Sequence, residues 1–158
     1  MKQTRAAVLA VDDSSDDTLM LRNACQRARA SFDLFTVEDG VEAIEYLTGV
    51  GPFQDRIRNP IPALMLLDLK MPRKNGFEVL EWLRTRAELK SLPVAVLTSS
   101  DHQSDVREAY NKGAKCYLMK PLDFDELTEL VSTISNGIHD NEQLWKNLAD
   151  LQFYRACI

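Results

Sequence analysis

Four apolar stretches of this chain are each followed directly by side chains that could bind a metal ion or a phosphoryl group. These side chains are Asp12 and Asp13 after residues 6–11, Asp68 after residues 63–67, Thr98 after residues 93–97, and Lys120 after residues 116–119. Carboxylates can act as nucleophiles or as ligands of hard cations, whereas an ammonium and a hydroxyl can bind phosphoryl oxygens. Each residue also has a plainer explanation, since Asp is favoured where a strand turns into a loop.

The apolar stretches themselves predict how these side chains are positioned. Unbroken apolar runs are typical of strands that are buried on both faces of a parallel sheet. They alternate with amphipathic segments at about residues 16–29, 40–47, 77–86 and 104–112, and a further helix starts near 123. The alternation predicts an α/β fold with a doubly wound, five-stranded parallel sheet and right-handed crossovers. Ligands bind at the carboxyl ends of the strands in such sheets, where all four groups would meet.

The acidic cluster after the first apolar stretch has two explanations. Ser15, Asp16 and Asp17 can be understood as the start of a helix, because Ser and Asp cap helices and acids favour the positive end of the helix dipole. Asp12 and Asp13 are explained less well in this way, because adjacent carboxylates repel unless a cation or a proton neutralises them.

A long connection and a C-terminal segment stand outside the regular alternation. Residues 48–62 carry several Gly and Pro residues and are unusually long for a connection in a compact α/β protein, so they form either a surface that contacts a partner or a solvated loop. Residues 140 to about 154 could form one more helix, with Leu144, Leu148 and Leu151 on one face and Trp145 beside them. That helix either folds back on its own domain or packs against a partner.

The overall composition excludes several classes of protein. A chain of 158 residues with 45% hydrophobic and 27% charged residues suits one globular domain. Its net charge of -5 and the absence of a Lys/Arg cluster argue against nucleic-acid binding. No apolar run approaches the ~20 residues of a membrane span, and no signal peptide precedes the first strand, so we expect a cytoplasmic protein. The few His and Cys residues lack the spacing of a zinc site.

Taken together, the strand-end motifs resemble those of the response-regulator receiver domain. The matching motifs are Asp-Asp after the first strand, Leu-Leu-Asp-Leu-x-Met-Pro with a following Gly, Thr-Ser-Ser after the fourth strand, and Gly-Ala-x-x-Tyr-x-x-Lys-Pro around the fifth. The resemblance implies a flavodoxin-like receiver domain over residues 5–136. Residues 137–158 would then be a C-terminal helical extension.

The resemblance implies a role for each acidic residue. Asp68 is similar to the phosphoacceptor that takes a phosphoryl group from a phosphohistidine on a histidine kinase. Asp13 and Asp68 would hold Mg²⁺ together with the backbone carbonyl of Lys70, while Asp12 would act through water. Magnesium suits such a site because it prefers oxygen ligands and keeps several waters.

The resemblance also implies how the phosphoryl group would be bound and sensed. Lys120 would offer a point charge and Thr98 a hydrogen bond to the phosphoryl oxygens. Tyr117 matches the switch aromatic that fills the space left when Thr98 moves toward the phosphate, although a half-buried strand aromatic without a switch role would carry the same residue. The Lys120-Pro121 bond would be cis. Lys70 and Ser100 occupy positions that control water access, which leaves the phosphoryl lifetime open.

Two further features bear on partners. Residues 46–53 resemble the long loops of small single-domain regulators paired with bacterial and cyanobacterial phytochrome kinases, which makes a phytochrome-type kinase the candidate partner. We also expect a homodimer through the face of the fourth strand, fifth strand and fifth helix, extended by Trp145, Leu148 and Leu151 of the tail.

Two other functions compete with the stand-alone phosphoacceptor. A degenerate receiver that only binds proteins would need a damaged site, and none of the five key positions is damaged. An aspartate-nucleophile phosphatase usually places a second acid two residues after the nucleophile, where this chain has Lys70. We therefore do not expect an enzyme in the ordinary sense. The module would support only its own phosphorylation and dephosphorylation.

Overall fold

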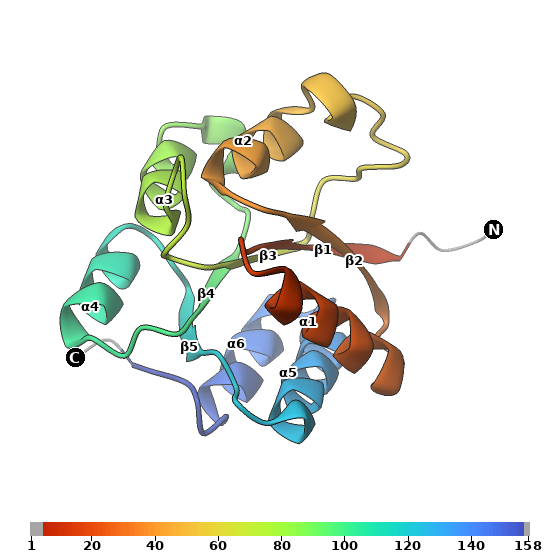
Figure 1. The fold of residues 1–158 in the computed structure, drawn as a ribbon, viewed down its shortest axis with the longest axis vertical. Helices are drawn as coiled ribbons and strands as arrows, with labels where there is room; N and C mark the ends of the chain where they lie inside the picture. Colours follow the sequence, from red (N-terminus) through yellow and green to blue (C-terminus); the bar gives the residue numbers. More distant parts are fainter. Residues whose placement is uncertain (1–4, 157–158) are drawn as a thin grey trace.

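A five-stranded parallel sheet forms the centre of the computed structural model, which describes residues 5–156 (Figure 1). The strand order is β2-β1-β3-β4-β5, and every neighbouring pair is parallel. The strands are β1 Ala6–Val11, β2 Phe32–Val37, β3 Leu64–Leu67, β4 Val94–Thr98 and β5 Cys116–Met119. The predicted fold class is confirmed.

Within the described residues, six α-helices cover the two faces of the sheet. They are α1 Ser15–Arg27, α2 Gly40–Thr48, α3 Gly76–Arg84, α4 Gln103–Asn111, α5 Phe124–Gly137 and α6 Asn141–Ala149, with short 3₁₀ helices at Gly51–Phe53 and Ala87–Leu89. Helices α1, α5 and α6 pack on one face, and α2, α3 and α4 on the other (Figure 1). The helices expected before α5 begin and end within two residues of these bounds. Over residues 5–156, no helix is both long and apolar enough to cross a membrane.

The register of the central strands brings the first acidic residues together. Val11 at the end of β1 lies opposite Leu67 at the end of β3, so Asp12 and Asp68 leave the sheet side by side. The backbone N–H of Asp68 donates to the carbonyl of Val11 at 3.0 Å, which extends the parallel pairing by one residue. All four residues of β3 are buried, as expected for a strand covered on both faces.

The long connection between α2 and β3 is ordered by one arginine. The guanidinium of Arg56 donates to the carbonyl oxygens of Tyr46, Leu47 and Asn59 at 2.6, 2.8 and 3.1 Å. The hydroxyl of Tyr46 donates to the carbonyl of Pro60 at 2.8 Å. These bonds satisfy polar groups that a loop of this length would otherwise leave to water.

The C-terminal segment contains a shorter helix than the sequence pattern predicts. Helix α6 ends at Ala149 instead of near Tyr154. The following backbone runs along β5: the N–H of Met119 donates to the carbonyl of Phe153, and the N–H of Arg155 donates to the carbonyl of Tyr117, both at 2.8 Å. Pairing with β5 takes the hydrogen bonds that further turns of helix would have supplied.

Helix α6 belongs to the core of its own domain. Leu144 and Leu148 are 1% and 0% exposed, and Leu151 is also buried, in the same cluster as the apolar face of α5. At Gly137 the two helices approach so closely that an added Cβ would lie 2.7 Å from the Cα of Leu144. The tail therefore folds back on its own domain. The expectation that Leu148 and Leu151 are free to join a dimer interface is wrong, because they are already buried within one chain.

Candidate functional site

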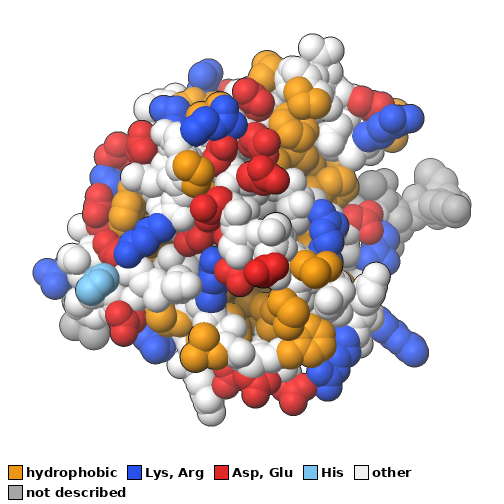
Figure 2. Space-filling view, viewed as in Figure 1, with side chains coloured by type: hydrophobic (Ala, Val, Ile, Leu, Met, Phe, Trp, Pro, Cys, Tyr) orange, Lys and Arg blue, Asp and Glu red, His pale blue; other side chains and the backbone are white. Residues whose placement is uncertain are grey.

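Three carboxylates gather at the carboxyl ends of β1 and β3. One oxygen from each of Asp12, Asp13 and Asp68 lies within 4.8 Å of the others. The side chains of Asp12 and Asp68 are only 11% and 8% exposed, whereas Asp13 is exposed. Figure 2 shows acidic side chains gathered in the middle of this face of the molecule. Carboxylate oxygens at this spacing match the donors that a hard divalent cation prefers, so the residues present fit a Mg²⁺ ion.

Asp68 is held in one orientation by its surroundings. Its Oδ1 accepts a hydrogen bond from the backbone N–H of Leu69 at 2.8 Å and a longer one from that of Lys70 at 3.5 Å. Its Oδ2 lies 3.2 Å from the Nζ of Lys120. Behind it, a Cβ at Gly76 would come within 2.3 Å of the Asp68 carbonyl oxygen, so only glycine fits there. The side chain is presented rigidly at the sheet edge.

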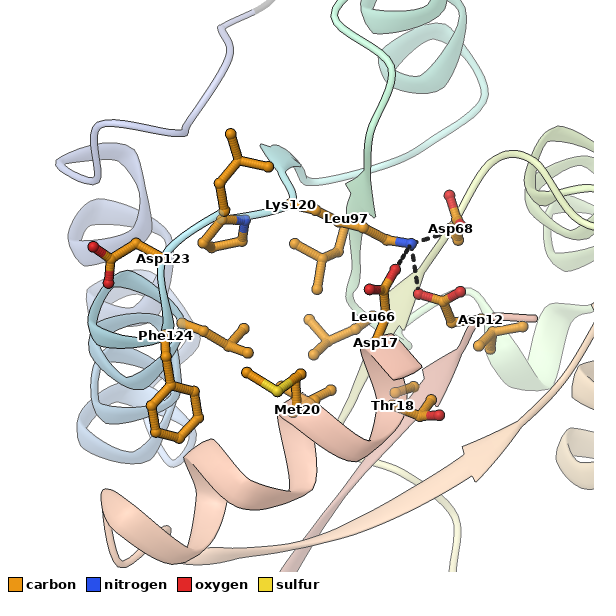
Figure 3. A pocket seen from close by; sticks show the side chains of 16 residues that line it. Asp12, Asp17, Thr18, Met20, Leu66, Asp68, Leu97, Lys120, Asp123 and Phe124 are labelled. Carbon is orange, nitrogen blue, oxygen red and sulfur yellow. Dashed lines mark hydrogen bonds and ion pairs between the residues drawn. The ribbon is translucent and has the colours of Figure 1, made fainter. Parts of the chain in front are cut away.

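Lys120 is the cation at the centre of the site. Its Nζ lies 2.7 Å from an oxygen of Asp12, 2.7 Å from one of Asp17 and 3.2 Å from one of Asp68 (Figure 3). Burial disfavours the charged ammonium, but the hydrogen bonds to Asp12 and Asp17 and the charge of Asp68 outweigh that effect and raise the pKa of Lys120. It therefore stays charged throughout the physiological range.

Burial is the stronger influence at Asp12. It raises the pKa of Asp12 even though Lys120 and the backbone N–H of Ser14 both donate to the carboxylate. Asp68 adds to the rise by repulsion. A bound cation would reverse this balance, because a positive charge beside the group favours its ionised form.

Sequence reasoning missed the role of Asp17. Its side chain was explained as part of a helix start, and Ser14 does cap α1 by accepting from the N–H of Asp17 at 3.2 Å. The Asp17 carboxylate, however, forms an ion pair with Lys120, which follows it by 103 residues in the sequence. The sequence signal that could have indicated this contact is the short distance of Asp17 from the end of β1. A helix that starts directly after β1 has its first turn beside the carboxyl ends of the strands.

Thr98 and Tyr117 lie next to the site without touching its carboxylates. Thr98 ends β4, is 1% exposed, and its carbonyl accepts from the N–H of Lys120 at 2.8 Å. Within residues 5–156, no hydrogen bond joins the Thr98 hydroxyl to Asp68 or Lys120. Tyr117 is fully buried, and its hydroxyl donates to the carbonyl of Ser100 at 2.7 Å. Burial raises the pKa of Tyr117 to about 12. The aromatic ring therefore points inward, whereas the alternative explanation assumed half-burial.

The peptide bond after Lys120 differs from the expectation. The described residues contain no cis peptide bond, so Lys120 and Pro121 are joined in trans. The trans isomer is favoured by about 0.5–1 kcal/mol for X-Pro bonds, and here Lys120 reaches the carboxylates from it.

The loop after Asp68 is fastened to the start of α2. Nε of Arg73 lies 2.7 Å from Oδ2 of Asp39, which also caps α2 by accepting from the N–H of Glu42. Arg73 has a φ of 64°, in the left-handed region that favours glycine. Burial acts to raise the pKa of Asp39, but the hydrogen bonds from Arg73 and from the Glu42 N–H outweigh it and lower that pKa. This contact steadies the segment that carries the Lys70 carbonyl.

A cavity of about 240 Å³ opens beside Lys120, between α1 and the start of α5 (Figure 3). Its walls are mainly apolar and include Met20, Leu66, Leu97 and Phe124. Asp12, Asp17 and Asp68 lie at one end of it.

Comparison with known proteins identifies the sequence pattern. The family model described as response regulator receiver domain matches residues 8–132, which is most of the chain. The match includes all the residues of the site described above.

Among known proteins, the response regulator Rcp1 of Synechocystis sp. is 33% identical over 129 residues, covering 82% of this chain and 86% of that protein. The crystal structure of its Mn²⁺-bound form has a TM-score of 0.72, with 32% identity over 84% of this chain and 93% of the other.

Two further solved structures are similar. The phosphorylated cyanobacterial phytochrome response regulator RcpA has a TM-score of 0.77 and 29% identity, and covers 87% of this chain and 96% of its own. A response regulator in red light signaling of R. palustris has a TM-score of 0.77 and 32% identity. The match covers 96% of this chain and 99% of that protein's chain.

Proposed function

Since the chain belongs to the response regulator receiver family and is a two-component response regulator, we propose that Asp68 is the residue that accepts the phosphoryl group. One oxygen of its carboxylate attacks the phosphorus of a phosphohistidine on a histidine kinase. The P–N bond breaks, the imidazole leaves with the electron pair, and Asp68 becomes an acyl phosphate. The observation that carries this proposal is the position of Asp68, buried and oriented by the Leu69 N–H beside Lys120.

We propose that Mg²⁺ is held by Asp13, Asp68 and the backbone carbonyl of Lys70, with Asp12 bound through water. When bound, the ion neutralises charge on the transferring phosphoryl group and among the carboxylates. The cluster of carboxylate oxygens within 4.8 Å supports this assignment, as does the Mn²⁺-bound form of Rcp1.

The remaining residues bind and report the phosphoryl group in this proposal. Lys120 donates to one phosphoryl oxygen, and the hydroxyl of Thr98 donates to another. Thr98 would move toward the phosphate, and Tyr117, which already points inward with its hydroxyl bonded to the carbonyl of Ser100, would fill the space that Thr98 leaves. The changed surface on α4 and α5 would then carry the signal.

A histidine kinase is the partner implied by the family, and we propose a phytochrome-type kinase. The support is the similarity to RcpA and to the R. palustris regulator, whose descriptions connect them with phytochrome and red light. We propose a cytoplasmic location as well, because the protein would have to meet this kinase. Residues 5–136 would carry out the phosphoryl chemistry, and residues 137–158 would extend the domain. The chain turns over only its own phosphoryl group.

Acetyl phosphate with Mg²⁺ tests the acceptor directly. We expect a single phosphorylated site in the wild type and no incorporation in Asp68→Asn, measured by intact-protein mass spectrometry. Asp150→Asn is the matched control, because Asp150 is an exposed carboxylate at the end of α6, and it should retain full incorporation. Phosphoryl group found on the Asp68→Asn protein would disprove the assignment.

Thermal unfolding with and without Mg²⁺ tests the metal site. A cation that binds only the folded state stabilises it by about 2.7 kcal/mol at a hundred times its Kd. The melting temperature of the wild type should therefore rise with Mg²⁺. An equal rise in Asp13→Ala would show that the ion binds elsewhere.

We also propose that the protein forms a homodimer through the face of β4, β5 and α5, extended by Trp145 of α6. Trp145 supports this, because it is the large apolar side chain of α6 that stays partly exposed. Sedimentation of the wild type and of Trp145→Ala, each with and without beryllofluoride, provides the test. Monomers throughout the micromolar range in every sample would contradict the dimer.

A further inference from the structure

The ammonium of Lys120 faces three carboxylates, and only two of them belong to the acidic cluster. Asp12 and Asp68 lie in the cluster, whereas Asp17 comes from the first turn of α1 (Figure 3). An ammonium has three donors, and three carboxylates lie within 3.2 Å of this one. The distances of 2.7, 2.7 and 3.2 Å show that Asp17 is held as tightly as Asp12 and more tightly than Asp68.

A divalent cation and Lys120 would interact with two of the same carboxylates. Lys120 contacts Oδ2 of Asp12 and Oδ2 of Asp68, and both residues supply oxygens to the cluster that fits a cation. Positive charges at this spacing repel each other, and the repulsion is strong because the site is largely shielded from water. Binding of the ion therefore weakens two of the three contacts of the lysine. The third contact, with Asp17, does not involve the cluster.

The start of α1 positions Asp17 for this third contact with Lys120. Its backbone N–H is fixed by the Oγ of Ser14, which sets the start of α1. Its side chain is 47% exposed, compared with 11% for Asp12 and 8% for Asp68, so it lies at the mouth of the site. The carboxylate is close enough to hold the ammonium and is not part of the cation cluster.

We propose that Asp17 is a positioning residue that acts through Lys120. It holds the ammonium beside the acceptor while a cation occupies the cluster of Asp12, Asp13 and Asp68. The cation and the lysine can then be present together when a phosphoryl group arrives. This inference rests on the proposed function for the cation and for Lys120, and it adds a residue that the strand-end motifs do not contain.

The Mg²⁺ affinity of Asp17→Asn tests the proposal without any phosphoryl donor. Asparagine keeps the shape and removes the charge, so only Asp12 and Asp68 then hold Lys120, and the cation has to weaken both of these contacts when it binds. We expect the Kd for Mg²⁺, measured by isothermal titration calorimetry, to rise about fivefold, the size expected for a partly exposed ion pair. Asp16→Asn is the matched control, because Asp16 is exposed on the same helical turn and, among residues 5–156, nothing pairs with its carboxylate. Its Kd should change less than about twofold, because exposed charges are screened.

The same substitutions in a Lys120→Gln protein separate an effect through the lysine from a general effect of charge. Lys120→Gln alone should tighten Mg²⁺ binding, and Asp17→Asn should then change the Kd no more than Asp16→Asn does. The proposal is overturned by equal effects of Asp17→Asn and Asp16→Asn in the wild-type background. It is also overturned by a Kd change that persists in the Lys120→Gln protein, or by a wild type that binds no Mg²⁺. Failure of the proposed function would be seen separately, as phosphoryl incorporation in Asp68→Asn.

Discussion

Replacing Leu148 by alanine is expected to destabilise the whole domain. Leu148 lies in α6, is 0% exposed, and packs in the cluster that contains Leu130 and Ile134 of α5. Removing a fully buried leucine side chain costs about 3–5 kcal/mol, since the cavity it leaves closes only in part. For a domain of this size, each kcal/mol lowers the melting temperature by about 2–4 °C. Leu148→Ala should therefore melt roughly 6–20 °C below the wild type.

Urea unfolding followed by circular dichroism measures this loss as a change in midpoint at an unchanged slope. Lys146→Ala is the matched control on the same helix. Its side chain is 68% exposed and forms only an i,i+4 pair with Glu142 at 3.4 Å. The control should stay within about 0.5 kcal/mol of the wild type.

The reasoning fails if Leu148→Ala unfolds at the same midpoint as Lys146→Ala. It also fails if the variant shows an early transition of α6 followed by a second transition at the wild-type midpoint. Either result would mean that α6 is not part of the cooperative core.

Two further outcomes follow from close contacts elsewhere. Gly137→Ala should lower the free energy of unfolding by about 1–3 kcal/mol in the same urea assay, because the new Cβ would lie 2.7 Å from the Leu144 Cα and a helix backbone cannot easily move away. A variant as stable as the wild type would contradict this prediction. Asp39→Asn should be less stable than the wild type at neutral pH, because the pKa of Asp39 is lowered in the folded protein by Arg73 and the helix-start N–H despite burial. Stability gained this way is present above the ordinary carboxyl pKa of 3.8 and is lost as the pH falls through the pKa of Asp39 in the folded protein. The difference in unfolding free energy between the wild type and Asp39→Asn should therefore disappear in strong acid. A difference that stays constant with pH would refute this prediction.

The positions of Asp12, Asp68 and Lys120 could be predicted from the sequence because of a property of parallel sheets. Every strand of such a sheet ends at the same edge, so residues that follow three apolar runs must meet there. Asp17 could not be found in the same way. It sits at a helix start, where an acid is already favoured by the helix dipole, so its residue type carried no sign of a distant partner.

The tail shows a second limit of sequence patterns. The spacing of Leu144 and Leu148 indicates a helix with one buried face, and that part is correct, whereas Leu151 is buried beyond the end of α6. The pattern does not say whether the face is buried in its own domain or against another chain, because both give the same free energy per unit area. Gly137 favours packing within the same domain, because the absence of a side chain lets α6 approach α5 closely.

Pairing of residues 153–155 with β5 has a consequence for how this protein can be recognised. An outermost strand of a sheet presents unpaired N–H and C=O groups, and such an edge invites strand addition by a peptide or aggregation with another copy. Here the bonds of Met119 and Tyr117 to Phe153 and Arg155 already satisfy that edge, and the hydroxyl of Tyr110 on α4 donates to the carbonyl of Arg155 at 2.6 Å. A ligand that binds this side of the molecule must therefore contact side chains, or displace residues 153–155 from β5.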